Sequence, residues 1–280
     1  MGTWERRNLE RWSKNIENFA SLDTESGAKY PPALSAWVHE LETDLLLQRT
    51  KPTRADAVID LGAGGGRFST FFAPRCGRVT AVEPSDLIGV LRANAAPFAN
   101  IECVRQRIQD IAFNGEFTIA LISGVLLNMP HEAAKLCLRL AAKALKPGGM
   151  LVLREPVARG GLVNVNWQYY RQGTEPRISD DSFFEYYRDP SFYRQACASH
   201  GLRHRETVIS HAPVFHFLPE SVPFRETLRN VVPFLIQSPR YRPLMKGYNA
   251  LMRHPYALVM DLLKKKTMSF HFFIKERGNA

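Results

Sequence analysis

The feature that most constrains the fold is the segment Asp60-Leu61-Gly62-Ala63-Gly64-Gly65-Gly66, which closes an apolar run that begins at Ala57. Glycines at alternating positions allow a tight turn between a buried strand and a helix that begins near Arg67 or Phe68. Such a turn brings backbone N–H groups and a helix N-terminus toward a ligand at the carboxyl edge of a parallel sheet. We therefore expect an α/β fold that binds a cofactor at this turn.

The pattern around the turn predicts the rest of this fold, because apolar β-rich runs alternate with helical stretches from about residue 57 to 155. We expect strands at 57–61, 78–83, 101–106, 117–123, 150–154, 206–210 and 268–275. We expect helices at 5–20, 33–48, 66–72, 85–95, 131–145, 181–187 and 190–200, the last ended by Gly201. The predicted architecture is a doubly wound, mostly parallel seven-stranded sheet.

The order of these elements divides the chain into four parts. Residues 1–50 are expected to form a helical cover, and residues 51–211 a Rossmann-like core in which 156–200 lies on the acceptor side. Residues 212–266 form a basic helical insertion that prolines are expected to break into short helices, and 267–280 supply the final strand.

The glycine spacing argues against a dinucleotide cofactor, since the sixth position of G-x-G-x-x-G is Arg67 or Ser69. Asp60-x-Gly62-x-Gly64-x-Gly66 instead resembles the first motif of the class I, Rossmann-like S-adenosylmethionine-dependent methyltransferases. That resemblance implies that Glu83, at the end of the second strand, binds both ribose hydroxyls, because a carboxylate can accept two hydrogen bonds at once.

Further segments resemble this family in the same order. Arg107-Ile108-Gln109-Asp110-Ile111 implies that Asp110 accepts a hydrogen bond from the adenine amino group, and Ser123-Gly124-Val125 implies backbone facing the methionine portion. The implied cofactor is S-adenosyl-L-methionine. The implied cofactor-binding residues are Tyr30, Asp60, Gly62, Ala63, Gly64, Gly66, Glu83, Pro84, Gln109, Asp110, Ile111, Ser123 and Asn128.

Methyl transfer from a sulfonium needs alignment more than a fixed catalytic motif, but an alcohol acceptor generally needs a base. The candidates by position are Glu155 at the end of the fifth strand, His131 after the fourth and His211 after the sixth. Each has a structural alternative: His131 as an exposed helix-start residue, Glu155 as the partner of a surface arginine, and His211 as a structural histidine.

The formal charge of +10 favours contact with an anionic partner. Residues 213–266 hold nine Lys or Arg against three acidic residues, interleaved with aromatic and apolar side chains. This insertion is expected to be either a plain lid or a surface for anionic lipid or a lipid-linked acceptor. Nucleic acid is not favoured, because no recognised motif accompanies the charge.

Other partner and cofactor classes receive less support. The four cysteines lack metal-ligand spacing, so no metal is expected, and no apolar run is long enough to span a bilayer. The charged start does not resemble a secretory signal, and the expected location is the cytoplasm, with peripheral membrane contact left open. The oligomeric state stays undetermined.

The predicted function is an S-adenosylmethionine-dependent methyltransferase that O-methylates a small molecule or glycan, with phosphate-bearing and lipid-linked acceptors included. The alternative is a catalytically silent cofactor-binding protein that regulates or scaffolds an anionic partner through the basic insertion.

Overall fold

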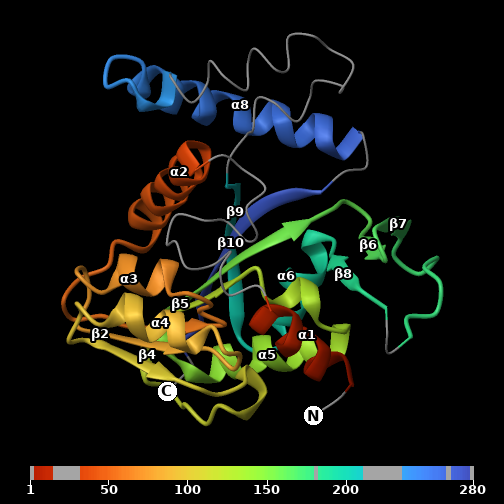
Figure 1. Cartoon of the computed structure of the whole chain (residues 1–280), viewed down its shortest axis with the longest axis horizontal. Coiled ribbons are helices and arrows are strands. Elements are labelled where there is room, and N and C mark those ends of the chain that lie inside the picture. Colours follow the sequence, from red (N-terminus) through yellow and green to blue (C-terminus); the bar gives the residue numbers. More distant parts are fainter. Residues whose placement is uncertain (1–2, 15–31, 180–181, 211–234, 263–265, 278–280) are drawn as a thin grey trace.

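A seven-stranded sheet in the order β3-β2-β1-β4-β5-β10-β9 forms the centre of the molecule. The computed structural model describes residues 3–14, 32–179, 182–210, 235–262 and 266–277 (Figure 1). The strands are β1 Ala57–Leu61, β2 Arg78–Val82, β3 Ile101–Val104, β4 Phe117–Ser123, β5 Leu145–Val157, β9 Leu202–Ile209 and β10 Thr267–Lys275. The first five are parallel, and β10 runs antiparallel to both β5 and β9. The predicted mostly parallel seven-stranded sheet is therefore confirmed.

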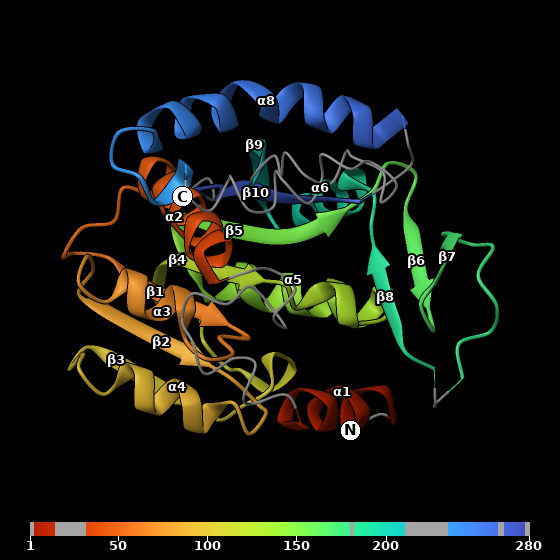
Figure 2. The same cartoon turned by 45° about the horizontal axis from the view of Figure 1, so that its top comes forward.

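Helices cover both faces of this sheet because apolar residues point to both sides of its strands (Figure 2). Ile59 and Leu61 pack against α5 (His131–Ala144) and α6 (Pro190–Ala198). The intervening Val58 packs on the opposite face, against α2 (Pro32–Thr50) and α3 (Arg67–Phe72). The remaining helices are α1 Thr3–Lys14, α4 Ile88–Ala95, α8 Arg242–Leu262 and the single-turn 3-10 helices η2 Ile108–Asp110 and η3 Leu126–Asn128.

The segment after β5 differs from the prediction. Residues 181–187 were expected to be helical, but Phe184–Tyr187 is strand β8, which joins β6 (Leu162–Val165) and β7 (Gln168–Arg171) in a separate three-stranded antiparallel sheet. Aromatic residues favour strands wherever a neighbouring strand is available for pairing, and β6 supplies it here. This small sheet stands beside the carboxyl ends of β4 and β5 (Figure 2).

The prediction for the basic insertion is also corrected where the structure describes it. Pro255 lies inside α8, which continues to Leu262 instead of breaking into short helices. The proline ring is on the exposed side of the helix, where water can satisfy the carbonyl group that its missing N–H leaves unpaired. Tyr256 and Met260 on the other side pack against Ile209 of β9 and hold the helix in place. Residues 211–234 and 263–265 of the insertion lie outside the described part of the chain.

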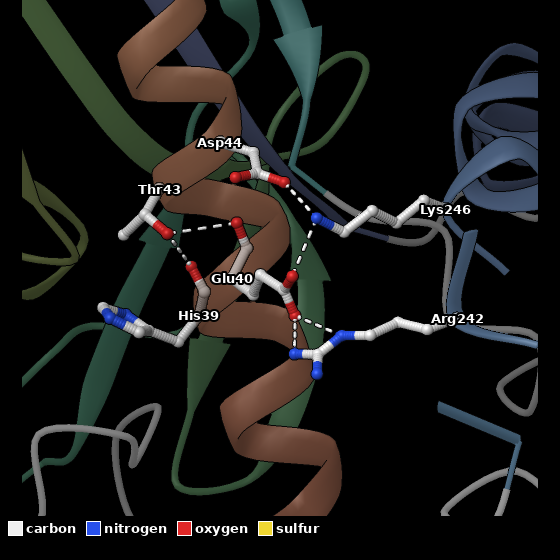
Figure 3. A network of polar contacts seen from close by, with 6 residues as sticks. All are labelled: His39, Glu40, Thr43, Asp44, Arg242 and Lys246. Atoms are coloured by element: carbon white, nitrogen blue, oxygen red, sulfur yellow. Dashed lines mark hydrogen bonds and ion pairs between the residues drawn. The ribbon is translucent and has the colours of Figure 1, made fainter. Parts of the chain in front are cut away.

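Two kinds of ionic contact fix α2. Glu40 and Asp44 on its outer side bind Arg242 and Lys246 of α8 (Figure 3). Glu42 on its inner side has no exposed surface and accepts hydrogen bonds from Arg154 of β5 at 2.7 Å and from the Ser210 hydroxyl at 2.6 Å. Arg67 of α3 also pairs with Glu42, so this carboxylate joins α2 to the sheet and to a neighbouring helix.

The buried contact should contribute more to stability than the outer one. We expect Glu42→Ala to lower the free energy of unfolding by about 3–5 kcal/mol, because it leaves the buried Arg154 without its counter-charge. Glu40→Ala removes only partly exposed pairs and should cost about 1 kcal/mol or less. Urea denaturation of both variants measures the difference, and equal losses would contradict the assignment.

Candidate functional site

The glycine turn after β1 is held tightly by the strand beside it. The N–H groups of Gly62 and Ala63 both donate to the carbonyl of Val82, at 2.8 and 3.0 Å. Gly62 has φ +80°, and a Cβ there would lie 2.4 Å from a methyl carbon of Val125. Gly66 has φ +90°, and a Cβ there would lie 2.6 Å from Leu91. These two positions need glycine for both conformation and space.

Two other glycines border open space. Gly64 after β1 and Gly124 after β4 have φ +55° and +67°, and a Cβ at either position would meet no atom within 4 Å. Because β1 and β4 are adjacent while β2 lies on the other side of β1, the strand order reverses between them. Open α/β sheets bind ligands at such a switch point, so these two backbones mark the position of a ligand.

Buried carboxylates lie directly beside this turn. Glu83, which is 6% exposed, follows β2 and accepts hydrogen bonds from the Gly64 N–H and the Ser85 N–H, both at 2.9 Å, and from the Ser85 hydroxyl. Asp60 accepts a 2.6 Å hydrogen bond from the Ser69 hydroxyl, and burial, with a smaller contribution from Glu83, raises its pKa to about 6. A carboxylate has about four acceptor sites, so Glu83 retains capacity for a further donor beside Gly64.

The expected adenine-binding segment follows β3. Asp110 is exposed, and its Oδ1 accepts a 2.7 Å hydrogen bond from Arg107, whose guanidinium holds the pKa of Asp110 below its usual range. Ile111 is buried and Gln109 is half-buried. An adenine amino group bound here would share the Asp110 carboxylate with the Arg107 guanidinium.

Helix α1 covers the carboxyl ends of three strands. Glu5 pairs with Arg107 after β3 at 3.0 Å, the Asn8 amide donates to the carbonyl of Asn128 after β4 at 2.6 Å, and the Ser13 hydroxyl accepts from the Asp86 N–H after β2 at 3.4 Å. Residues 15–20 of the helix predicted at 5–20, and Tyr30, lie outside the described residues.

The turn after β4 is clamped by a buried acid and a buried arginine. Glu155 has no exposed surface and accepts hydrogen bonds from the N–H groups of Val125, Leu126 and Leu127, at 2.9, 3.0 and 3.2 Å. Arg188, also fully buried, donates to the carbonyl of Leu126 at 2.6 Å and to that of Met129. Burial raises the pKa of Glu155 to about 7, while its backbone hydrogen bonds oppose that rise.

This geometry corrects the expectation for Glu155. The residue was predicted to point toward the cleft as a base or to pair with a surface arginine. Its carboxylate instead accepts three backbone hydrogen bonds from the turn after β4, so Glu155 is a positioning residue for that turn. Sequence reasoning missed Arg188, because a lone arginine after an aromatic run carries no signal of what it binds.

Asn128 ends this turn and is 6% exposed. Its side-chain amide donates to the carbonyl of Gly124 at 3.5 Å, while its Oδ1 is buried and has no hydrogen-bond partner. A buried acceptor without a donor is costly, and a bound ligand could supply that donor. Asn128 and Gly124 are thereby brought together on the β4 side of the switch point, with Ser123 ending the strand.

His131 begins α5 and is enclosed by the small sheet and α6. Its ring meets Tyr186 and Phe192 edge-on, with centroids 4.8 and 5.2 Å away, and its Nε2 lies 2.6 Å from the amide nitrogen of Gln172. Burial first, and then the charge of Arg188, lowers the pKa of His131. The imidazole is therefore neutral at neutral pH. His211 lies outside the described residues.

One face of the small sheet carries polar side chains that were not anticipated. The Tyr187 hydroxyl donates to Glu185 and accepts a 2.7 Å hydrogen bond from Lys266, and the Asn164 amide donates to Glu185 at 3.1 Å. Asn164 is 1% exposed and its Oδ1 has no hydrogen-bond partner. Trp167 and Tyr169 lie on the hairpin of this sheet and are largely exposed.

Residues 58–149 match the family model described as a methyltransferase domain. Among solved structures, the geranyl diphosphate C-methyltransferase from Streptomyces coelicolor A3(2), in complex with Mg²⁺, geranyl diphosphate and S-adenosyl-L-homocysteine, has 11% identity and a TM-score of 0.61 over 97% of this chain and 98% of that one. The cyclase SpnF has 15% identity and a TM-score of 0.61 over 99% and 97%. A comparison with curated protein sequences gives no significant match.

A third structure, the 1,6-didemethyltoxoflavin-N1-methyltransferase from Burkholderia thailandensis with its acceptor and S-adenosylhomocysteine, has 13% identity and a TM-score of 0.56 over 99% of this chain and 92% of that one. These similarities concern the fold, and the family match concerns the segment that carries the glycine turn, Glu83 and Asp110. Residues 58–149 thus match a methyltransferase domain, and the chain shares the fold of class I S-adenosylmethionine-dependent methyltransferases, as the sequence motifs predicted.

Proposed function

We propose that the protein transfers a methyl group from S-adenosyl-L-methionine to an oxygen of a small-molecule or glycan acceptor. The observation that carries this proposal is the buried Glu83 carboxylate beside Gly64, at a backbone position that faces open space at the switch point. A diol-bearing ligand placed there would donate a hydrogen bond to the acceptor site that Glu83 retains.

The residues present fit this cofactor from one end to the other. Glu83 would hold the ribose hydroxyls, Asp110 would accept from the adenine amino group, and the unpartnered Oδ1 of Asn128 would accept from the methionine ammonium. The cofactor supplies an electrophilic methyl group on a sulfonium, so no residue needs to activate it. Gly64 and Gly124 give the close approach that an aligned displacement requires.

The chain's own contribution is to align the acceptor and exclude water. The clamp formed by Glu155 and Arg188 fixes the backbone from Val125 to Met129, which borders the proposed methionine side. Helix α1 closes the same edge through its contacts after β2, β3 and β4.

A small-molecule acceptor is supported by two of these neighbours, which bind geranyl diphosphate and 1,6-didemethyltoxoflavin. We place the acceptor against the polar face of the small sheet, where Asn164, Glu185 and Tyr187 meet. For a hydroxyl acceptor, the base would be His131, which is neutral and next to this sheet, or His211.

The second candidate is a protein that binds the cofactor without transferring its methyl group. SpnF favours it, since that protein is a [4+2]-cyclase and shares the fold over nearly the whole chain. The two candidates differ in turnover and not in cofactor binding.

Calorimetric titration with S-adenosylhomocysteine tests the cofactor site. We expect the wild-type protein to bind it and not NAD. Glu83→Ala should weaken binding about 10- to 100-fold, because it removes a charge-assisted hydrogen bond of about 1.5–3 kcal/mol.

The matched control is Glu116→Ala. Glu116 is an exposed glutamate just before β4, at the opposite edge of the sheet, and its loss should leave the affinity unchanged. Absence of binding to the wild-type protein, or equal weakening in both variants, would sink the cofactor assignment.

Separate variants distinguish a base from a positioning residue. If His131 is the base, His131→Gln should lower kcat by about 10²–10⁴ with unchanged affinity for S-adenosylhomocysteine. The wild-type kcat should then fall as pH drops through a pKa below 6.5, because only the neutral imidazole accepts a proton.

Glu155→Gln should behave differently, since an amide nitrogen replaces one of the two carboxylate oxygens that accept hydrogen bonds from the turn. We expect a lower melting temperature and weaker cofactor binding together. Normal stability with a selective loss of kcat would restore Glu155 as the base. His211→Gln is assayed in the same way, by methyl transfer to hydroxylated small molecules. Full activity in both histidine variants would exclude His131 and His211 as the base.

A further inference from the structure

Helix α8 presents two different faces. Its inner face is buried: Asn249, Tyr256 and Met260 are 5–7% exposed. Met245 packs with Trp37 and Leu41 of α2, and Tyr256 packs against β9. The helix lies at the outside of the molecule, beyond α2 and β9 (Figures 1 and 2). Its opposite face is therefore left without a partner among the described residues.

That outer face carries apolar residues at alternating intervals of three and four. They are Tyr241, Leu244, Tyr248, Leu251, Pro255 and Leu258, here called the α8 stripe. On a helix, this spacing places the side chains in one line. The leucines are 70%, 74% and 62% exposed and the tyrosines 36% and 37%. Single exposed leucines are ordinary, but an aligned set marks an interaction surface.

The charges of this part of the sequence are mostly positive. Residues 235–266 contain seven Lys or Arg and one acidic residue, Asp261. Arg240, just before the helix, is exposed. Arg242 and Lys246 do not add to this surface, because they are bound to Glu40 and Asp44 of α2 (Figure 3).

A second copy of the chain fits this surface poorly. Two stripes placed together would bring two strongly cationic segments against each other, because residues 235–266 hold seven Lys or Arg and only Asp261 as an acid. One helix face also falls short of the roughly 800 Å² per partner that stable interfaces bury. An anionic lipid surface satisfies both conditions, because it supplies the negative charge and an apolar layer into which side chains insert.

We propose that the α8 stripe docks on an anionic membrane surface, with α8 lying in the plane of the interface. Leucines would enter the acyl boundary, tyrosines would lie at headgroup level, and Arg240 would meet phosphate. Among the described residues, no helix has the length and hydropathy of a membrane-spanning segment. The proposal does not depend on the function proposed above.

Vesicle flotation of the full chain at low salt tests the proposal. Wild-type protein should float with vesicles of phosphatidylcholine and phosphatidylglycerol and much less with phosphatidylcholine alone. The triple variant Leu244→Gln, Leu251→Gln, Leu258→Gln should lower the apparent partition coefficient roughly hundredfold or more, because it removes three inserted side chains. Arg240→Glu should weaken binding to the anionic vesicles only.

The matched control is Leu47→Gln, at another leucine exposed at 42%, on α2 and away from the stripe, which should leave flotation unchanged. Binding of S-adenosylhomocysteine should be equal in all variants, which separates this proposal from the cofactor assignment. Failure of the wild-type protein to float, or an equal loss with Leu47→Gln, would overturn the proposal. So would a dimer in light scattering that the triple variant dissociates.

Discussion

The turn between β4 and α5 is the constraint on which the rest of the site depends. Glu155 accepts from three consecutive N–H groups of this turn, and Arg188 donates to two of its carbonyl groups. Both side chains are fully buried, so water does not compete for these hydrogen bonds. A backbone held from both sides by opposite charges presents Gly124 and Asn128 at a fixed place. The β1 turn meets it there, through the contact between Gly62 and Val125.

The two sides of the switch point are therefore built by different means. On the β1 side, glycine conformation and two hydrogen bonds to Val82 shape the turn, and Glu83 anchors it through Gly64. On the β4 side, charged residues from β5 and from the end of the small sheet do the same. Because Arg188 follows β8, the segment that we propose for the acceptor also stabilises the turn that we propose for the cofactor.

The comparisons give the fold of this frame. The neighbours named above share it at 11–15% identity, and they are two methyltransferases with different acceptors and one cyclase. The reaction therefore does not follow from the fold alone. The segments of this chain outside the family match at 58–149 include α1, the small sheet and α8.

The sequence alone determined the sheet and its cofactor turn, because local patterns fix both. Alternating glycines after Asp60 predict the turn, and short apolar runs predict the strands, since those signals lie within a few residues of one another. Tertiary structure decided the rest. Phe184–Tyr187 became a strand only because β6 is beside it, and α8 continues through Pro255 because β9 supports its inner face. The role of Glu155 likewise depends on backbone about 30 residues earlier in the chain, and no local pattern reports which distant N–H groups a buried carboxylate will meet.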